Sequence, residues 1–415
     1  MVSSDGPARG MVGPRPGPPR RSRRSRRGLL TFQSSLRRPR LTMRPFPARL
    51  ILVALTAHGC ASEDGIGVGP VADDELVCDL DPAYLADGGV GRDGIPALSD
   101  PLLVPISPVV PENAFVRDTD RVIAVRVGAE SIVIPHNIMW RHEIVNFSSG
   151  LDRMSVTYCP LTGTALAFTR TGTGGAELGV SGFLYQANLV MYDRNEPNES
   201  FWPQMLGEAR CGPRSGTRLA RLPVVEMTMA GWKELHPESK MVGVGSGLSD
   251  WRLYVRNPYG EDYDDPHNAD FEGYPIVLDD DRLPPKERVL GLPAEAPGAS
   301  PIAFSFAAME HAGDHAVFEI TYGGAPAMVL WDGPRHAAMA YRMEVEGSAA
   351  TFEAAAGGAR DSLTGTVWAV DGTPVAGPLA GTGRRLRPIA EAYVAFWGAW
   401  AAFHPGTVLG LSPVD

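Results

Sequence analysis

The residues best suited to chemistry lie close together in the first half of the chain. His136, His142 and Glu143 precede a stretch that begins at Tyr158 and Cys159 and continues as Pro-Leu-Thr-Gly-Thr. A cysteine at the end of a strand, followed by proline and a glycine turn, would be presented rigidly. His142 is nearby in the sequence, so two roles are predicted for Cys159. It is either a ligand in a soft nitrogen–sulfur site for a transition metal such as copper or a thiol nucleophile activated by the imidazole.

Cys159 also has structural alternatives, because the chain contains three further cysteines, Cys60, Cys78 and Cys211. In an oxidising compartment two cysteines can simply pair, and Cys159–Cys211 would be the natural bridge within this half of the chain. A bridge from Cys159 to Cys78 is a second alternative, and a buried, inert thiol is a third. The sequence leaves all of them open.

Familiar catalytic motifs do not occur in the sequence. It contains no G-x-S-x-G, no P-loop, no H-E-x-x-H and no C-x-x-C. The acidic stretch does not match a calcium-binding EF-hand loop either. A template starting at Asp262 places His267 at position six, where glycine is needed, and Gly273 at position twelve, where glutamate is needed. We expect a solvated connecting loop there. The sequence predicts no reaction, and whether the protein is an enzyme stays open.

The elements that must hold these residues are predicted to be mainly strands. Four runs are rich in β-prone residues and bounded by turn residues: 120–127, 153–158, 165–168 and 189–192. The 47 glycines and 37 prolines also favour many turns. Two helices are predicted at 224–235 and 389–403, each followed by His-Pro. The predicted fold class is mainly β with a few helices (α+β).

An internal duplication relates two parts of the chain. Five matches occur in the same order: 120–124 with 287–291, 154–170 with 327–342, Trp202 with Trp368, 212–217 with 377–382, and 232–237 with 400–405. Arg121 precedes His236 by 115 positions, and Arg288 precedes His404 by 116. The matches indicate two tandem homologous β-rich domains, which we expect to pack as a pseudo-symmetric pair. His236 and His404 are expected to cap the helix ends.

The amino-terminal sequence indicates that the protein is exported, and it is not expected to form part of the fold. Residues 1–42 carry eleven arginines and one acid, and we interpret them as an Arg-rich extension upstream of the true start, with a disordered extension as the alternative. Residues 43–59 have the order of a signal peptide: a basic stretch, an apolar run too short to cross a bilayer, and small residues before Cys60. Residues 57–60 resemble a bacterial lipobox. We expect Cys60 to be lipidated, with simple secretion as the alternative.

The rest of the chain divides into four parts: a tether and entry segment (60–118), the first repeat domain (119–237), an acidic connecting segment (238–286) and the second repeat domain (287–415). The total charge is −10, and residues 1–42 contribute +10, so the remainder carries −20. Such an acidic protein should repel nucleic acid and anionic lipid. We predict an extracytoplasmic protein, lipid-anchored, periplasmic or secreted, that binds no nucleic acid and meets the membrane only through Cys60.

Longer motifs resemble a known family. Residues 140–146, 156–161, 180–193, 222–226 and 281–290 are similar to the bacterial family of domain of unknown function 3179, over about residues 100–410. The resemblance implies a secreted or lipid-anchored bacterial protein without an assigned reaction. His142 and Cys159 match the family pattern. Thr162 stands where members often carry a second cysteine, which argues against a two-thiol site.

Two functions follow from these observations. The first is a metal-binding or thiol-dependent extracytoplasmic protein, in which Cys159 and His142 act as metal ligands or as nucleophile and base. It requires Cys159 to be reduced and close to His142. The alternative is a non-catalytic ligand-binding or envelope-assembly module, in which a groove between the two repeats holds a small molecule or an envelope protein.

Overall fold

The computed structural model describes residues 78–415 apart from 128–129, 149–152, 246–250 and 412–415. The predicted Arg-rich extension, the signal peptide and the lipidation site at Cys60 lie outside these residues. The described residues all belong to one compact unit. None of the helices among them is long and apolar enough to cross a membrane.

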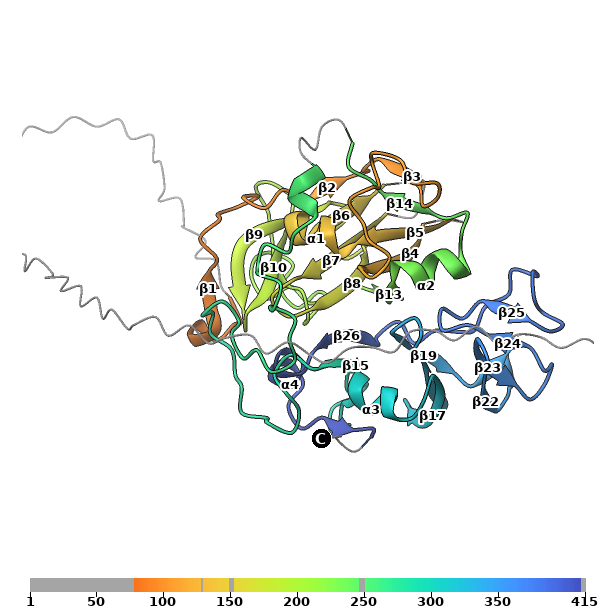
Figure 1. The fold of residues 1–415 in the computed structure, drawn as a ribbon. Helices are drawn as coiled ribbons and strands as arrows, with labels where there is room; N and C mark the ends of the chain where they lie inside the picture. The colour runs from red at the N-terminus through yellow and green to blue at the C-terminus, as the bar shows by residue number, and fades with distance from the viewer. Residues whose placement is uncertain (1–77, 128–129, 149–152, 246–250, 412–415) are drawn as a thin grey trace, which may run out of the picture. The chain divides into compact units, whose positions relative to one another are not determined.

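Two sheets with matching strand order organise the fold, which is mostly β (Figure 1). The first has the order β13-β4-β5-β14-β3 and consists of β3 (Leu103–Pro105), β4 (Arg121–Val127), β5 (Glu130–Pro135), β13 (Val225–Thr228) and β14 (Lys240–Val242). The second has the order β26-β15-β16-β27 and consists of β15 (Arg288–Leu292), β16 (Ile302–Ser305), β26 (Tyr393–Phe396) and β27 (Val408–Leu409). In each sheet the first two pairings are antiparallel and the third is parallel.

Further sheets accompany each of these, and their strand pairings are antiparallel except that of β2 with β6, which is parallel. The first is accompanied by β12-β8-β7-β6-β2 and β1-β9-β10-β11, formed by β1 (Leu85–Asp87), β2 (Leu98–Ser99), β6 (Ile144–Phe147), β7 (Met154–Cys159), β8 (Thr164–Thr169), β9 (Leu178–Tyr185), β10 (Asn188–Asp193), β11 (Phe201–Pro203) and β12 (Arg221–Leu222). After β16 come β17-β18-β19, β20-β21 and β22-β23-β24-β25, formed by β17 (His315–Tyr322), β18 (Ala325–Asp332), β19 (Ala337–Arg342), β20 (Glu344–Val345), β21 (Ser348–Ala349), β22 (Phe352–Ala355), β23 (Gly358–Asp361), β24 (Val367–Trp368) and β25 (Pro374–Ala376).

The helices in the described part are short, and each follows directly after a strand of the two matching sheets. They are α1 (His136–His142), α2 (Met229–Leu235), α3 (Phe306–His311) and α4 (Trp397–Phe403), with 3-10 turns at Pro82–Tyr84 and Trp251–Tyr254. His236 and His404 are the C-cap residues of α2 and α4, as predicted. Each ring packs on the tryptophan one turn earlier, His236 on Trp232 and His404 on Trp400.

The four predicted strands are confirmed as β4, β7, β8 and β10. The two predicted helices, 224–235 and 389–403, are wrong in their first halves. Val225–Thr228 and Tyr393–Phe396 are strands, because they pair along β4 and β15 and so satisfy their backbone groups in a sheet. Only the last seven residues of each run form a helix.

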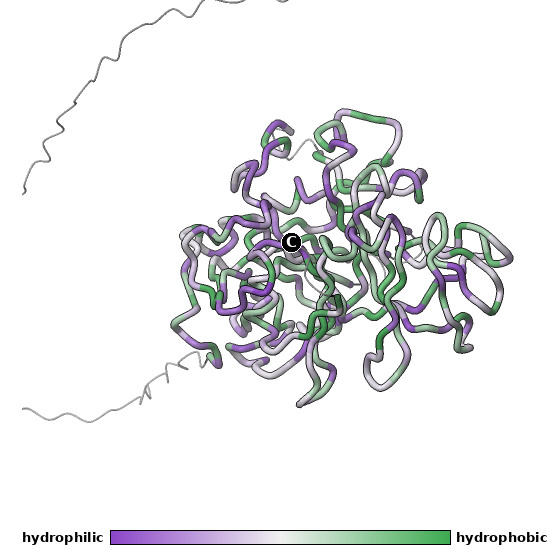
Figure 2. The backbone as a smooth tube through the Cα atoms, turned by 60° about the horizontal axis from the view of Figure 1, so that its bottom comes forward, coloured by the Kyte–Doolittle hydropathy of each residue, from purple (hydrophilic) through white to green (hydrophobic). Residues whose placement is uncertain are grey.

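The two matching sheets are connected crosswise. β8 packs against β26, and β19 packs against β13. Phe396 N–H donates to Thr162 O at 2.9 Å, and Thr228 N–H donates to Arg335 O at 3.1 Å. Thr162 lies in the β7–β8 hairpin tip and Arg335 in the β18–β19 tip, so each tip contacts the strand end of the opposite sheet. The apolar residues gather in the strands of the interior (Figure 2).

The acidic connecting segment is more than the solvated loop that the sequence predicts. Its acidic residues are mostly exposed, but Tyr263, Phe271 and Leu283 are buried in the same apolar cluster as Trp397 and Trp400. These buried side chains fix the segment against β15 and α4.

Candidate functional site

Cys159 ends β7 and is completely buried. It is the free cysteine among the described residues, and its Sγ–H points to Ala187 O at 3.7 Å. Burial, together with the nearby Glu143 carboxyl group, raises the pKa of the Cys159 thiol to about 11. The side chain is therefore a neutral thiol at physiological pH, which is poorly suited to act as a nucleophile.

His142 lies in the last turn of α1, and both of its ring nitrogens are occupied. Nδ1 lies 2.7 Å from Pro96 O and Nε2 lies 2.8 Å from the Tyr254 hydroxyl. The neutral tautomer with a proton on Nδ1 satisfies both contacts. His142 therefore has no ring nitrogen left to activate Cys159 or to bind a metal, and the structure shows no contact between these two side chains among the described residues.

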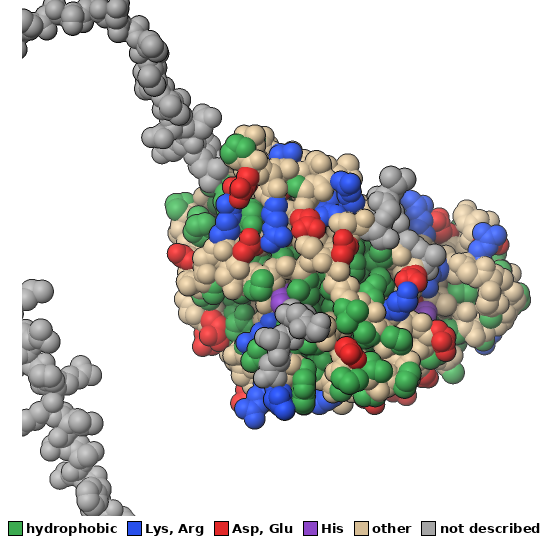
Figure 3. All heavy atoms as spheres, turned by 90° about the horizontal axis from the view of Figure 1, so that it is seen from above, with side chains coloured by type: hydrophobic (Ala, Val, Ile, Leu, Met, Phe, Trp, Pro, Cys, Tyr) green, Lys and Arg blue, Asp and Glu red, His purple; other side chains and the backbone are tan. Residues whose placement is uncertain are grey.

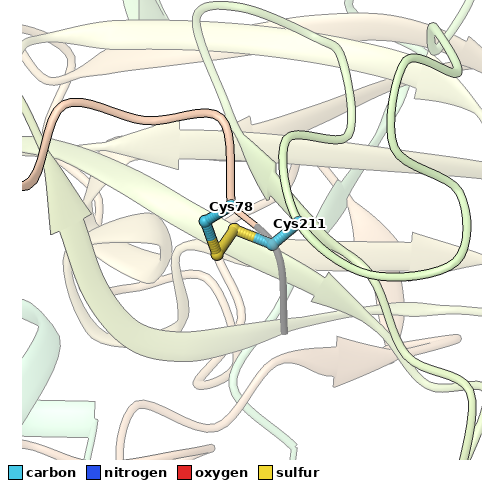
Figure 4. The surroundings of a disulfide bond; sticks show 2 residues. All are labelled: Cys78 and Cys211. Atoms are coloured by element: carbon cyan, nitrogen blue, oxygen red, sulfur yellow. A yellow bond between two sulfur atoms is a disulfide. The ribbon is translucent and has the colours of Figure 1, made fainter. Parts of the chain in front are cut away.

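The disulfide differs from the one favoured by the sequence. Cys211 is bonded to Cys78, so a bridge from Cys159 to either of them is wrong, and of the alternatives left open by the sequence the buried free thiol is the one observed (Figure 4). The cause is the path of the chain: Cys78 lies across a β-bridge from Cys211, and Asp79 N–H donates to Arg210 O at 2.8 Å. Cys159 lies inside the core instead. The bridge attaches the start of the described chain to the loop that precedes β12.

The residues present do not fit the transition metal suggested by the sequence. Within the described residues, no three His, Cys, Asp or Glu side chains come together as a group that could hold a metal ion. A soft site needs a thiolate and a free imidazole nitrogen, and Cys159 and His142 offer neither. Their joint role stays a prediction.

A different set of polar residues converges between the two matching sheets, and we call it the polar centre: Arg121, His136, Glu226, Asp264, Arg288 and His336. Arg121 and Arg288 open β4 and β15, and their side chains are only 11% and 12% exposed. In the first sheet Thr228 pairs with Arg121 and Glu226 pairs with Ile123. Residues two apart share a face of a strand, so Arg121 and Glu226 are diagonal neighbours on one face of the sheet.

Arg121 reaches from the first sheet to the β18–β19 hairpin. Its Nη1 donates to His336 Nδ1 at 2.9 Å and to His336 O at 3.0 Å, at the tip of the β18–β19 hairpin. Its guanidinium lies over the Phe306 ring at 5.8 Å. Nε and Nη2 are buried without a hydrogen-bond partner among the described residues.

Arg288 reaches the polar centre from the start of β15. Its Nη2 donates to Asp264 Oδ2 at 2.5 Å, and its guanidinium lies over the Phe396 ring at 5.1 Å. Nη1 is buried and, like the two Arg121 nitrogens, finds no partner in the described part of the chain. Lys286, two residues earlier, is fully buried and donates to Tyr263 O at 2.9 Å, which holds the segment that carries Asp264 in place.

His136 and Glu226 form a buried pair beside Arg121. His136 Nε2 lies 2.9 Å from Glu226 Oε2, and the side chains are 4% and 1% exposed. Burial lowers the pKa of His136, so the ring is neutral and its Nε2–H donates a hydrogen bond to the carboxylate. Burial would raise the pKa of Glu226, but the His136 hydrogen bond and the charges of Arg121 and Arg288 outweigh it and lower that pKa. Glu226 is therefore ionised.

The two arginines influence each other electrostatically. Burial and then the positive charge of Arg288 lower the pKa of Arg121 to about 10, so Arg121 remains charged at neutral pH. Burial, and then the positive charges of Arg121 and Arg288, lower the pKa of His336 to about 4, so the His336 ring is neutral. In the described part of the chain, the polar centre thus holds two carboxylates and two guanidinium groups with buried N–H donors that make no hydrogen bond. This arrangement can bind a ligand that accepts several charge-assisted hydrogen bonds.

Glu143 occupies a separate place from the polar centre. It is the C-cap residue of α1, with a left-handed φ of 55°, and it is 5% exposed. Burial raises the pKa of Glu143 to about 8. Its side chain lines a cavity of about 180 Å³ together with Tyr259, Glu272 and Tyr274.

Sequence reasoning missed the arginines and Glu226 as functional residues. Arg121 and Arg288 served only to align the repeats, and Glu226 served only as part of a family motif. The available signal was a charged residue inside an otherwise apolar run, Val-Val-Glu-Met at 224–227, and an arginine at the start of the corresponding strand in each predicted repeat. Such residues are rarely buried unless paired or functional.

Charges outside the polar centre are mixed. On the face drawn in Figure 3, acidic and basic side chains of the described residues lie among one another rather than gathering by sign. Within the described residues, the polar centre holds three buried guanidinium nitrogens without a hydrogen-bond partner, whereas Arg141, Arg170, Arg210 and Arg335 each have one.

Comparison with known proteins places the chain in one group. Residues 92–407, most of the chain, match the family described as Protein of unknown function (DUF3179). No curated protein and no solved structure matches the chain. The resemblance predicted from the motifs is confirmed, and the chain belongs to the DUF3179 family.

Proposed function

We propose that this protein is an extracytoplasmic binding protein whose ligand places an anionic group between Arg121 and Arg288. The observation that carries the proposal is a set of buried guanidinium nitrogens that make no hydrogen bond within the described residues: Nε and Nη2 of Arg121 and Nη1 of Arg288. Arg121 Nε forms only a 4.0 Å ion pair with Glu226 Oε2. A buried donor without a partner costs about 1–3 kcal/mol, and more when it is charged. A ligand oxygen at this place would relieve that cost for several donors at once.

The contacts favour binding over chemistry at Cys159. The Cys159 thiol is buried and has a raised pKa, and both His142 nitrogens are hydrogen-bonded elsewhere. The metal- or thiol-dependent function stays a prediction that no contact favours. The binding function needs no movement of these two residues.

We further propose that the two halves arose by duplication and that the polar centre lies on their pseudo-symmetric interface. The matching strand order supports this, as does the crosswise contact of β8 with β26 and of β19 with β13. Trp232 Nε1 donates to Ser239 Oγ and Trp400 Nε1 donates to Thr407 Oγ1, both over seven residues. The halves differ at the site, because Val394 stands in the second sheet where Glu226 stands in the first.

The proposed location outside the cytoplasm is part of this function. The Cys78–Cys211 disulfide supports it, because such bonds persist in oxidising compartments. The lipidation of Cys60 remains a proposal based on the lipobox-like sequence. A lipid anchor would keep a binding protein at the envelope, where its ligand arrives from outside.

The test is isothermal titration calorimetry of the purified protein with inorganic phosphate as the probe, beside Arg288→Met. Losing hydrogen bonds from a charged group worth about 1.5–3 kcal/mol should weaken phosphate binding by about 10- to 100-fold. Arg384→Met is the matched control, because Arg384 is 62% exposed and pairs only with Glu346 among the described residues. No phosphate binding, or equal binding by Arg288→Met, would contradict the proposal.

A further inference from the structure

The polar centre offers a hydrogen-bond acceptor beside its donors. Glu226 Oε2 receives the His136 Nε2–H, but Oε1 is buried and has no partner among the described residues. An ionised carboxylate can only accept hydrogen bonds. A ligand that satisfies the arginine nitrogens and leaves Oε1 facing one of its own oxygens would therefore meet repulsion.

We infer that the ligand is an anion that carries a hydrogen-bond donor on or beside its acidic oxygens, as a hydrogen phosphate group does. The inference rests on the proposed function and names the class of anion that the same site takes. The acidic oxygens would accept from Arg121 Nη2 and Arg288 Nη1. The ligand's own O–H would donate to Glu226 Oε1.

The charges of the site support this choice. Glu226 and Asp264 offset the positive charges of Arg121 and Arg288, so the polar centre has no excess positive charge to attract a bare dianion. Specific hydrogen bonds must then provide the affinity. A site built to receive an O–H rejects the analogue that lacks it, because its buried polar group is left unpaired.

The position of Oε1 is fixed by its surroundings. Glu226 lies in β13, paired with Ile123 of β4, and His136 begins α1 directly after β5. The His136 ring packs on Tyr158 with centroids 4.3 Å apart. Because His136 holds Oε2, the carboxylate cannot turn to exchange its oxygens without breaking that bond. Oε1 therefore stays the carboxylate oxygen that has no hydrogen-bond partner among the described residues.

The experiment compares inorganic phosphate with sulfate by calorimetry at pH 7, where phosphate carries at least one proton and sulfate carries none. We expect the wild-type protein to bind phosphate at least about 100-fold more tightly than sulfate. In Glu226→Gln the amide oxygen keeps the His136 bond, which leaves the amide N–H₂ in place of Oε1. The acceptor becomes a donor, so the preference should reverse toward sulfate.

The control is Glu353→Gln, which removes the same charge from a side chain that is 77% exposed. It should keep the wild-type preference. Equal affinity of the wild type for phosphate and sulfate would overturn the inference and leave anion binding intact. Binding of neither anion, with Arg288→Met indistinguishable from the wild type, would overturn the proposed function as well. Thermal unfolding checks that Glu226→Gln is folded, and if it is not, the wild-type comparison alone decides.

Discussion

Replacing Cys78 and Cys211 by serine tests whether these two cysteines are paired and how much their disulfide stabilises the fold. The disulfide joins residues 133 positions apart. The chain-entropy relation gives about −17 cal/mol/K for a loop of this size, or about 5 kcal/mol at 25 °C. Removal of a native disulfide costs about 2–5 kcal/mol in practice. We therefore expect the double variant to lose about 3–5 kcal/mol in the free energy of unfolding.

The assay is urea unfolding followed by tryptophan fluorescence, with and without a reductant. Reductant should destabilise the wild-type protein by the same amount as the double substitution and should leave the double variant unchanged. Cys159→Ser is the matched control, because Cys159 is buried and free, and it should keep the full response to reductant. A Cys159→Ser protein that no longer responds, or a double variant as stable as the wild type, would refute the pairing.

Two further predictions concern the hairpin tip and a buried carboxylate. Gly163 has a φ of 60°, and a Cβ there would lie 2.8 Å from the Phe396 ring. Gly163→Ala should therefore lower the free energy of unfolding by about 2 kcal/mol or more in urea titrations. An unchanged free energy of unfolding would contradict the packing of this hairpin tip. Burial would raise the pKa of Asp371, but the hydrogen bond and charge of His236, with Thr373 and Arg385, lower it to about 2. An aspartate pKa below its usual 3.8 stabilises the fold above about pH 4 by about 2.5 kcal/mol, and this contribution is lost as the pH falls toward 2. Asp371→Asn should thus differ most from the wild type at pH 7 and least near pH 2, and a constant difference in unfolding free energy across this range would contradict the shift.

The strands could be predicted from the sequence because local patterns determine them. The run at 120–127 alternates and ends in turns, and it forms β4. The predicted helices at 224–235 and 389–403 are too long because Val225–Thr228 and Tyr393–Phe396 are too short for their residue pattern to tell a strand from a helix. Pairing with β4 and β15, which local sequence does not encode, decides for the strand.

The candidate site could not be predicted in the same way. Cys159 and His142 drew attention because they are reactive residue types close in sequence, but their contacts point to different neighbours. Arg121, Glu226 and Arg288 are far apart in sequence and meet only through the pairing of β13 with β4 and the crosswise contact of the two sheets. Burial decides their significance, and burial is a property of the complete fold.

The most direct test of an anion site between Arg121 and Arg288 is crystallographic. Arsenate carries a proton as phosphate does, and its arsenic atom can be located by anomalous scattering. In crystals soaked with arsenate, we expect an arsenic peak between the two guanidinium groups, with an arsenate oxygen within hydrogen-bond distance of Glu226 Oε1. Ordered water alone at the polar centre, with arsenic absent or bound elsewhere, would contradict the central claim.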